Sequence, residues 1–240
     1  MISVTFDNLG EVTALARGQW PVGEPLGQHF SVTRALPRLL ELLDETGVRA
    51  TFFVEGLNTE LYPDALRGIA AAGHEVAYHG WRHEPWADLE PAAERESLER
   101  GVRAMDELGL RPVGFRPPGG ELTPATPGLL RELGFTYCSP EAGAAEPLDG
   151  IAVLPFRWPL VDAFHYLPHF GDLRERYLGS PDPQPPARLR AEIEAALGGE
   201  GFVALLFHPF LLDDDEHFAV LRDVLEHVDA LPCREVAAVR

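Results

Sequence analysis

Short apolar runs rich in β-branched and aromatic residues alternate along the chain with longer amphipathic stretches. This alternation predicts repeated strand and helix units, and therefore an α/β fold built on a parallel sheet. Because the apolar runs are short and nearly continuous, we expect strands that are buried on both faces. The seven predicted strands are Ile2–Phe6, Ala50–Val54, Glu75–Tyr78, Val113–Phe115, Phe135–Cys138, Ile151–Leu154 and Phe202–Phe207.

The amphipathic stretches between the predicted strands have the apolar spacing of helices. A glycine follows each of Leu36–Glu45, Pro63–Ala72 and Ala92–Leu108, and glycine is the residue that most often ends a helix. The acidic run Asp213–Glu216 precedes another helical pattern, where carboxylates favour the positive end of the helix dipole. We interpret this run as a helix start rather than as a binding site.

Two segments break the alternation and are expected to be loops. Leu9–Phe30 contains several glycines and prolines and has the length of a segment that could cover a site, while Ser180–Pro186 is rich in proline. A helix is expected to begin near Ala187. No repeat or composition change marks a domain boundary, so we expect residues 1–240 to form a single domain.

Composition limits the partners of the protein. A formal net charge of -18 argues against nucleic acid and against an anionic membrane as partners, and makes a neutral or cationic substrate easier to accommodate. The segment Met1–Asp7 lacks the pattern of an export signal, and no later stretch is apolar enough to span a bilayer, so we expect a cytoplasmic protein. Cys138 and Cys233 are predicted to be unpaired thiols.

Polar residues with catalytic potential follow directly after several predicted strands. Asp7–Asn8 ends the first strand, His79 and His83 follow the third, Arg116 follows the fourth, and His208 follows the last. In a closed parallel barrel these positions share the C-terminal rim, where active sites of such barrels lie. We therefore interpret the set as one functional site.

His79 and His83 are four residues apart. If the segment turns helically, both imidazoles can face one metal ion such as zinc. The alternative is a pair of hydrogen-bonded or surface histidines, which the neighbouring polar strand ends make less favourable. We expect metal binding.

The other polar residues at this rim suit proton transfer. Asp7 could remove a proton from an attacking water, with Arg116 holding the carboxylate ionised through a charge-assisted contact. His208 could protonate a departing amine, and Asp162 could orient that histidine. A strand-end ion pair and a buried structural histidine are the alternatives.

Arg116–Gly120 combines a charged side chain with prolines and glycines and is expected to form a pocket wall. Four aromatic residues occur near the same motifs: Trp81, Trp86, Trp158 and Phe210. We expect these four to serve mainly in packing.

The ordered motifs resemble those of the polysaccharide deacetylase (NodB-homology) family over nearly the whole chain. The matching segments are Thr5–Asn8, His79 with His83, Arg116–Gly119, Asp162 and Leu206–Pro209, with supporting matches at Ala50–Val54, Gly73–Val76 and Leu130–Phe135. The resemblance implies a distorted seven-stranded (β/α) barrel and a hydrolase that removes N-acyl groups. It also implies a catalytic base at Asp7, its partner at Arg116, a general acid at His208 and a residue that tunes the acid at Asp162.

The resemblance further implies a divalent metal, most simply zinc, held by an acidic residue and two histidines. His79 and His83 match the histidines, but Asn8 stands where the family usually has a second aspartate. An amide is a neutral and weaker donor, which leaves the charge of the cation uncompensated. Three outcomes stay open: weak but functional binding through Asn8, recruitment of Asp7 as a ligand, or a reaction without metal.

The leading hypothesis for function is a metal-assisted deacetylase that acts on a small or nucleotide-linked N-acyl amino sugar. The first alternative is a hydrolase that opens a cyclic amide, imide or ureide without metal, suggested by Asn8 and by the insertion Leu9–Phe30. The second is a non-catalytic binding protein on the same barrel, against which Asp7, Arg116 and His208 argue. The expected partner is a small-molecule or carbohydrate amide, and the resemblance to intracellular relatives suggests a homo-oligomer.

Overall fold

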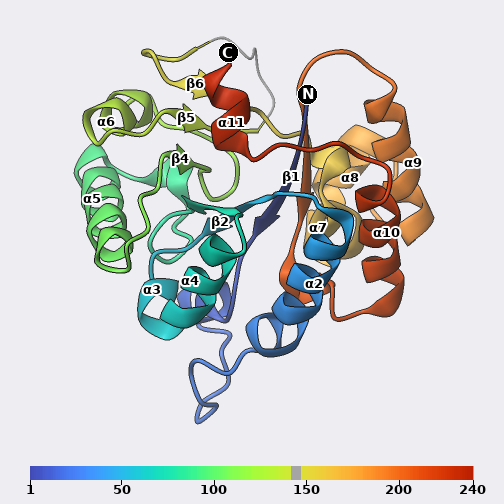
Figure 1. Ribbon diagram of the computed structural model, residues 1–240, viewed down its shortest axis with the longest axis horizontal. Coiled ribbons are helices and arrows are strands. Elements are labelled where there is room, and N and C mark those ends of the chain that lie inside the picture. Colours follow the sequence, from blue (N-terminus) through green and yellow to red (C-terminus); the bar gives the residue numbers. More distant parts are fainter. Residues whose placement is uncertain (142–146, 240) are drawn as a thin grey trace.

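A seven-stranded parallel sheet forms the centre of the fold (Figure 1). The computed structural model describes residues 1–141 and 147–239. The strands lie in the order β6-β5-β4-β3-β2-β1-β7. Their bounds are β1 Ile2–Asp7, β2 Thr51–Val54, β3 Glu75–Tyr78, β4 Gly114–Phe115, β5 Tyr137–Cys138, β6 Ala152–Val153 and β7 Val203–Phe207.

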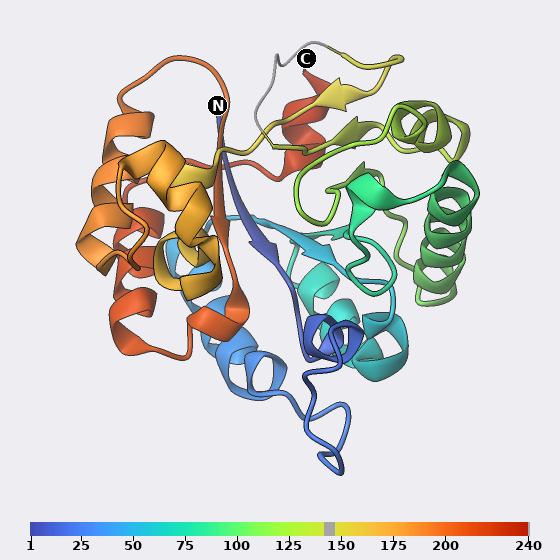
Figure 2. The same cartoon turned by 180° about the vertical axis from the view of Figure 1, so that it is seen from behind.

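Helices surround the sheet, as Figures 1 and 2 show from opposite sides. α5 and α6 lie along one side of the molecule, and α9 and α10 along the other. The helix bounds are α1 Val12–Ala16, α2 Leu36–Thr46, α3 Asn58–Leu61, α4 Pro63–Ala71, α5 Pro91–Glu107, α6 Thr126–Glu132, α7 Asp162–Tyr166, α8 Gly171–Leu178, α9 Pro186–Leu197, α10 Asp215–Leu225 and α11 Cys233–Ala238. A π-helical turn, Ser31–Ala35, leads into α2, and short 3₁₀ turns cover Trp86–Asp88, Trp158–Leu160, Pro168–Phe170 and Pro209–Leu211.

The longest strand pairing places β1 at the middle of the core. β1 pairs with β2 on one side and with β7 on the other, with Thr5 aligned to both Thr51 and Leu206. Val4 and Phe6 are almost fully buried in the main hydrophobic cluster. Because both faces of these strands are covered by side chains, burial rather than alternation explains their continuous apolar sequence.

The barrel is distorted at the side where β6 and β7 would meet. Among the described residues these two strands do not pair, and β6 and β7 form the two edges of the sheet. A single bridge between Val161 and Leu206 brings the segment after β6 against β7 instead. The predicted distorted seven-stranded (β/α) barrel is therefore confirmed.

The predicted helix and strand positions agree with the structure to within one or two residues. Gly47 ends α2 in the left-handed conformation with φ 68°, as its position after the helix predicts. The acidic run acts as a helix start, because the Asp214 carboxylate accepts hydrogen bonds from the backbone of Glu216 and His217. Pro186, expected at the end of a loop, instead begins α9, since proline fits the first turn of a helix.

The expectation that Leu9–Phe30 is a loop throughout is wrong, because part of the segment is helical. α1 forms there, and its Val12 packs in a buried cluster with Leu57 and Trp81. The short helix is stabilised by this tertiary packing, which local sequence periodicity does not reveal.

Two further expectations concern the thiols and membrane spans. Cys138 and Cys233 are buried and unpaired, as predicted. Within residues 1–141 and 147–239, no helix has both the length and the apolar character needed to cross a membrane.

Two helical glycines should respond oppositely to substitution by alanine. A Cβ at Gly101 in α5 would lie 2.2 Å from the Tyr78 ring, whereas a Cβ at Gly68 in α4 meets nothing within 4 Å. Gly101→Ala should lower the free energy of unfolding by about 1–3 kcal/mol through overpacking, and Gly68→Ala should raise it by about 0.5–1 kcal/mol. Urea denaturation measures both, and equal effects would contradict the packing of α5 on β3.

Candidate active site

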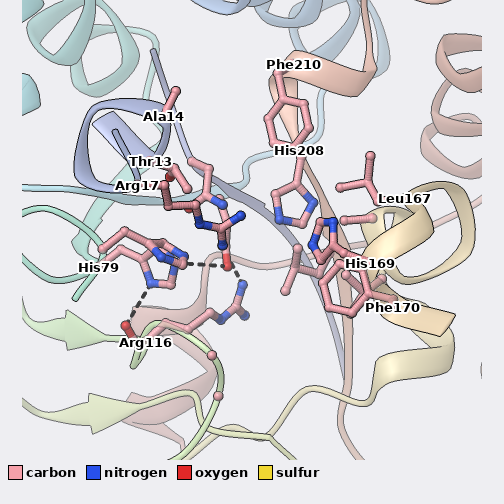
Figure 3. A pocket seen from close by; sticks show the side chains of 18 of the residues that line it. Thr13, Ala14, Arg17, His79, Arg116, Leu167, His169, Phe170, His208 and Phe210 are labelled. Atoms are coloured by element: carbon pink, nitrogen blue, oxygen red, sulfur yellow. Dashed lines mark hydrogen bonds and ion pairs between the residues drawn. The ribbon is translucent and has the colours of Figure 1, made fainter. Parts of the chain in front are cut away.

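One cavity of about 490 Å³ opens at the C-terminal ends of the strands (Figure 3). Six of the seven residues predicted for the site line it, and the seventh, Asp162, contacts one of them from behind. The six lining residues are Asp7, Asn8, His79, His83, Arg116 and His208. The structure therefore brings together residues that are up to two hundred positions apart in the chain.

Asp7 and Arg116 form a buried ion pair at the floor of the cavity. Arg116 Nη1 lies 2.7 Å from Asp7 Oδ1, and the same nitrogen donates to Thr5 Oγ1 at 3.0 Å. The other two guanidinium nitrogens donate to Ser139 Oγ at 3.2 and 2.9 Å, and the guanidinium carbon lies 4.0 Å from the centre of the Phe53 ring. Arg116 is thus fixed on several sides, and it fixes Asp7 in turn.

His79 presents an unprotonated nitrogen to the cavity. Its Nδ1 lies 2.8 Å from the carbonyl oxygen of Arg116, and a carbonyl can only accept, so Nδ1 carries the proton. Its Nε2 is therefore a free acceptor, 3.7 Å from Asp7 Oδ2. Burial lowers the pKa of His79 to about 3, and the neighbouring charge of Arg116 also lowers it. The neutral imidazole has the protonation state that a metal ligand requires.

His83 reaches the same cavity through a turn that is not helical, so the helical arrangement considered for His79 and His83 is wrong. Gly80 and His83 have φ values of 75° and 60°, and the Glu84 carboxylate holds the turn by accepting from the backbone N–H of Trp81 at 2.9 Å. The two imidazole rings nevertheless lie with centroids 5.0 Å apart. Burial lowers the pKa of His83 to about 3, and the adjacent His79 lowers it further.

Asn8 carries a buried oxygen without a hydrogen-bond partner. Its backbone is left-handed, with φ 61°, a conformation that asparagine adopts more readily than most residues. Its Oδ1 is among the buried side-chain atoms that have no partner within the described structure. Buried polar atoms are normally satisfied, so this oxygen is available to a ligand.

The residues present fit a cation through their donor chemistry. The set consists of the imidazoles of His79 and His83 and the amide oxygen of Asn8, with the Asp7 carboxylate next to His79. Within residues 1–141 and 147–239, no group of three His, Cys, Asp or Glu side chains is arranged to hold a metal. A cation held by both imidazoles would take its third protein donor from the Asn8 oxygen, and this neutral set should bind it more weakly than a set with a carboxylate.

His208 and Asp162 form a second hydrogen-bonded pair at the site. Asp162 Oδ1 lies 2.5 Å from His208 Nδ1, and Asp162 Oδ2 accepts from the backbone N–H of His208 at 2.8 Å. The N–H of Ala163 donates to the same carboxylate at 2.6 Å. The aspartate fixes the orientation of the imidazole and leaves its Nε2 directed away from the pair.

The segment between β6 and β7 provides an apolar wall. Phe156, Trp158, Leu167 and Phe170 line the cavity there, and Phe210 lines it beside His208. In Figure 3, Phe170 and Leu167 lie next to His208, opposite His79. An apolar wall facing polar donors suits an organic ligand with one reactive group.

The predictions for the surrounding residues are only partly right. Trp81 and Trp86 are buried in packing, as expected. Trp158 packs against a buried cluster, as expected, but it also lines the cavity, as Phe210 does. Arg116–Gly120 forms part of the cavity wall, as predicted.

Two buried polar residues at the same rim were missed in the sequence. Ser139 follows β5 and binds Arg116. Glu55 follows β2 and accepts a hydrogen bond from Asn58 at 3.0 Å. Both come directly after a strand, so the rule that identified the other site residues would also have found them. Burial raises the pKa of Glu55 to about 8, and the negative charge of Asp7 adds to this rise.

The segment 9–30 also contributes to the cavity. Thr13, Ala14 and Arg17 line it from α1 and its C-terminal end, and His29 and Phe30 line it from the end of the segment. The sequence predicted that this segment could cover a site, without naming these residues. The structure places them at the mouth of the same site.

Comparison with known proteins identifies the family. The sequence pattern of the polysaccharide deacetylase family matches residues 1–138, more than half of the chain, and this chain belongs to that family. A peptidoglycan deacetylase-like protein of Gibberella zeae is 36% identical over 103 residues, which cover 42% of this chain and 30% of that protein. The chain spans about a third of the length of the curated relatives it matches.

Solved structures agree with the family assignment. A Mycobacterium smegmatis protein provisionally described as a polysaccharide deacetylase is 32% identical, with a TM-score of 0.82 over 99% of this chain and 88% of that one. A PuuE allantoinase is 20% identical, with a TM-score of 0.72 over 99% of this chain and 88% of that one. The second likeness concerns the fold alone.

Glu55 should make stability depend on pH. Its carboxyl group keeps its proton in the folded protein up to a pKa of about 8, whereas the unfolded chain loses it near 4.5. The free energy of unfolding should therefore fall as pH rises between these values, by about 1.4 kcal/mol per pH unit. Urea denaturation from pH 5 to 8 should show a shallower decline in Glu55→Gln than in wild type. Glu96→Gln, at an exposed position of α5, is the control, and parallel profiles for all three proteins would show that Glu55 is ionised when folded.

Asn8→Asp should strengthen metal binding, because a carboxylate is a stronger donor and offsets the charge of the cation. Aspartate tolerates the left-handed backbone at this position nearly as well as asparagine. We expect the affinity for Zn²⁺ to rise by about one order of magnitude or more, measured on metal-stripped protein by competition with a chromophoric chelator. His79→Ala in the Asn8→Asp background should abolish the gain. Equal affinities of wild type and Asn8→Asp would exclude the side chain at position 8 as a ligand.

Proposed function

We propose that this protein is a hydrolase that removes an acyl group from an N-acyl amino sugar or a related small amide. The observation that carries the proposal is the presence of two charge-linked pairs, Asp7 with Arg116 and His208 with Asp162, at one cavity. Amide hydrolysis needs a base for the attacking water and an acid for the leaving nitrogen. The family membership and the named deacetylases among the relatives support the same activity.

Asp7 supplies the base in this proposal. Arg116 occupies Oδ1, so Oδ2 is the oxygen that can accept a proton from water. The carboxylate is only 4% exposed, and Arg116 is a permanent cation that stabilises its charge. The pair therefore keeps a base in place at the floor of the cavity.

His208 supplies the acid. Asp162 accepts the Nδ1 proton, which leaves Nε2 as the nitrogen that can donate to the departing amine. The carboxylate stabilises the positive charge of the protonated imidazole before the transfer. Figure 3 shows His208 across the cavity from His79, and Asp7 Oδ2 lies 3.7 Å from His79 Nε2, so an amide between them would meet the base and the acid on different sides.

A divalent cation, when bound, would polarise the amide carbonyl and the attacking water. Asn8, His79 and His83 are the residues that would hold it, and their imidazole-rich chemistry suits zinc. The nearby Asp7 contributes compensating charge without leaving its contact with Arg116. This division of roles keeps Asp7 as the base.

Opening of a cyclic amide, imide or ureide is the second candidate. The neutral donor set at Asn8 favours it, because a reaction that relies less on a metal needs no carboxylate there. The apolar wall formed by Trp158 and Phe170 also suits a compact ring better than a long polymer. The two intact charged pairs argue against a purely binding role.

The test measures acetate release from small N-acetyl amino sugars and from chitin oligomers, in parallel with ring opening of a ureide and imide panel. His208→Gln should lower kcat by about 10²–10⁴-fold through loss of the acid, and Asp7→Asn by a similar factor through loss of the base. Circular dichroism checks the folding of both variants, since Asp7→Asn leaves the Arg116 charge unpaired. His227→Gln, on the exposed surface, should retain wild-type activity.

Two outcomes would reject the deacetylase proposal. Wild-type rates of acetate release in folded His208→Gln would remove the acid from the mechanism. Ring opening of a cyclic substrate without acetate release from any sugar, unchanged by a metal chelator, would establish the second candidate instead.

A further inference from the structure

Arg17 is held at the mouth of the cavity by a well-defined helix end. Gly18 has φ 65°, its N–H donates to the Leu15 carbonyl at 3.1 Å, and the N–H of Gln19 donates to the Ala14 carbonyl at 2.8 Å. These two bonds around a left-handed glycine form a Schellman motif, the common terminus of a helix. The backbone of Arg17, the last residue before this glycine, is therefore fixed in position.

The rest of the insertion is tied to the barrel independently of Arg17. The Glu11 carboxylate accepts from the N–H of Gly27 at 2.7 Å and from the hydroxyl of Tyr62. That hydroxyl in turn accepts from the N–H of His29 at 2.8 Å. Because Glu11 is 1% exposed, this network anchors both ends of the segment without a ligand.

The side chain of Arg17 lines the cavity but has no partner there. Among the described residues, its guanidinium makes no hydrogen bond and no ion pair, in contrast to Arg116, which has several. The formally charged residues that line the cavity are Asp7, Arg17 and Arg116. Since Asp7 and Arg116 neutralise each other, Arg17 leaves one uncompensated positive charge on the lining.

This positive charge stands out against the rest of the molecule. The protein has a formal net charge of -18, so its long-range field opposes the approach of an anion. Any anion that binds must therefore be recognised by direct contact inside the cavity. A guanidinium suits this task, because its planar fork can donate two parallel hydrogen bonds to a carboxylate or a phosphate.

Arg17 reaches the cavity from the end of α1, whereas the groups assigned to base and acid follow β1 and β7. His208 and the apolar wall lie on the other side of the cavity (Figure 3). Arg116 already pairs with the Asp7 carboxylate. Arg17 is thus free to bind a part of the substrate outside the amide.

We propose that Arg17 is a specificity-determining residue that pairs with a carboxylate or phosphate group of the substrate, outside the amide that is hydrolysed. The inference rests on the proposed amide hydrolysis and narrows its substrate class to anionic N-acyl compounds. Neutral N-acyl sugars then bind without this contact and are poorer substrates.

The experiment compares three probes that share an N-acetyl amino sugar: N-acetylglucosamine 6-phosphate, N-acetylmuramic acid, and neutral N-acetylglucosamine. Calorimetry measures binding to wild type and to Arg17→Gln, and acetate release gives kcat and KM for each probe. We expect wild type to bind at least one anionic probe about 10–100-fold more tightly than the neutral sugar. Arg17→Gln should remove this preference through Kd and KM, so that the anionic and the neutral probes bind this variant with Kd values within about twofold of each other.

Arg111→Gln is the matched control. Arg111 is exposed and precedes β4, so it lies at the opposite end of that strand from Arg116. This variant removes the same charge without altering the cavity and should behave like wild type. A loss of preference in Arg111→Gln as well would assign the effect to net charge and overturn the proposal.

The outcomes separate this inference from the proposed function. Failure of wild type to prefer either anionic probe, or an equal loss for charged and neutral probes in Arg17→Gln, overturns the role of Arg17. A preference that depends on Arg17 without acetate release from any probe supports the anion site and rejects deacetylation. A preference for only one anionic probe supports the site and identifies its ligand as carboxylate or phosphate.

Discussion

The buried contact between Asp7 and Arg116 is the interaction on which the site depends. It joins the end of β1 to the end of β4, with two strands between them in the sheet. Thr5 accepts from the same guanidinium nitrogen as Asp7, and Ser139 accepts from the other two. Breaking one partner of a buried pair is costly, because the other charge is left unpaired in a medium of low polarity. The backbone carbonyl of the same arginine accepts a hydrogen bond from His79 Nδ1, so one residue positions both Asp7 and His79.

The opening of the sheet between β6 and β7 gives the site its shape. A closed symmetrical barrel would surround its centre with strand ends alone, whereas here the segment after β6 crosses to β7 and brings Trp158 and Phe170 into the cavity. On the opposite side, α1 contributes Arg17. The polar residues at the strand ends thus lie between two walls that are formed outside the sheet, and such segments can vary without disturbing the strand ends.

Asn8 puts a neutral amide at the position where the family usually has an aspartate. Its left-handed backbone and its unpartnered oxygen keep the geometry of a donor, but its neutrality removes the charge that usually compensates a cation. His79 and His83 are both neutral because burial lowers their pKa values. Asp7 carries a negative charge beside His79, and Arg116 already shares it. A cation at this position would therefore find little negative charge to compensate its own.

The sequence by itself determined the order of the strands along the chain and the rim that carries Asp7, His79, Arg116 and His208. The reason is that a polar residue directly after a buried parallel strand lies at the C-terminal rim, which all these strands share. It could not determine that α1 is helical, that the turn to His83 is left-handed, or that Trp158 lines the cavity. These features arise from contacts between distant segments, such as the packing of α1 against Trp81. The local spacing of apolar residues does not predict such contacts. Only the tertiary structure decided which side chains already have partners. Arg116 makes several hydrogen bonds and an ion pair that hold the site together, whereas the Arg17 guanidinium makes none among the described residues.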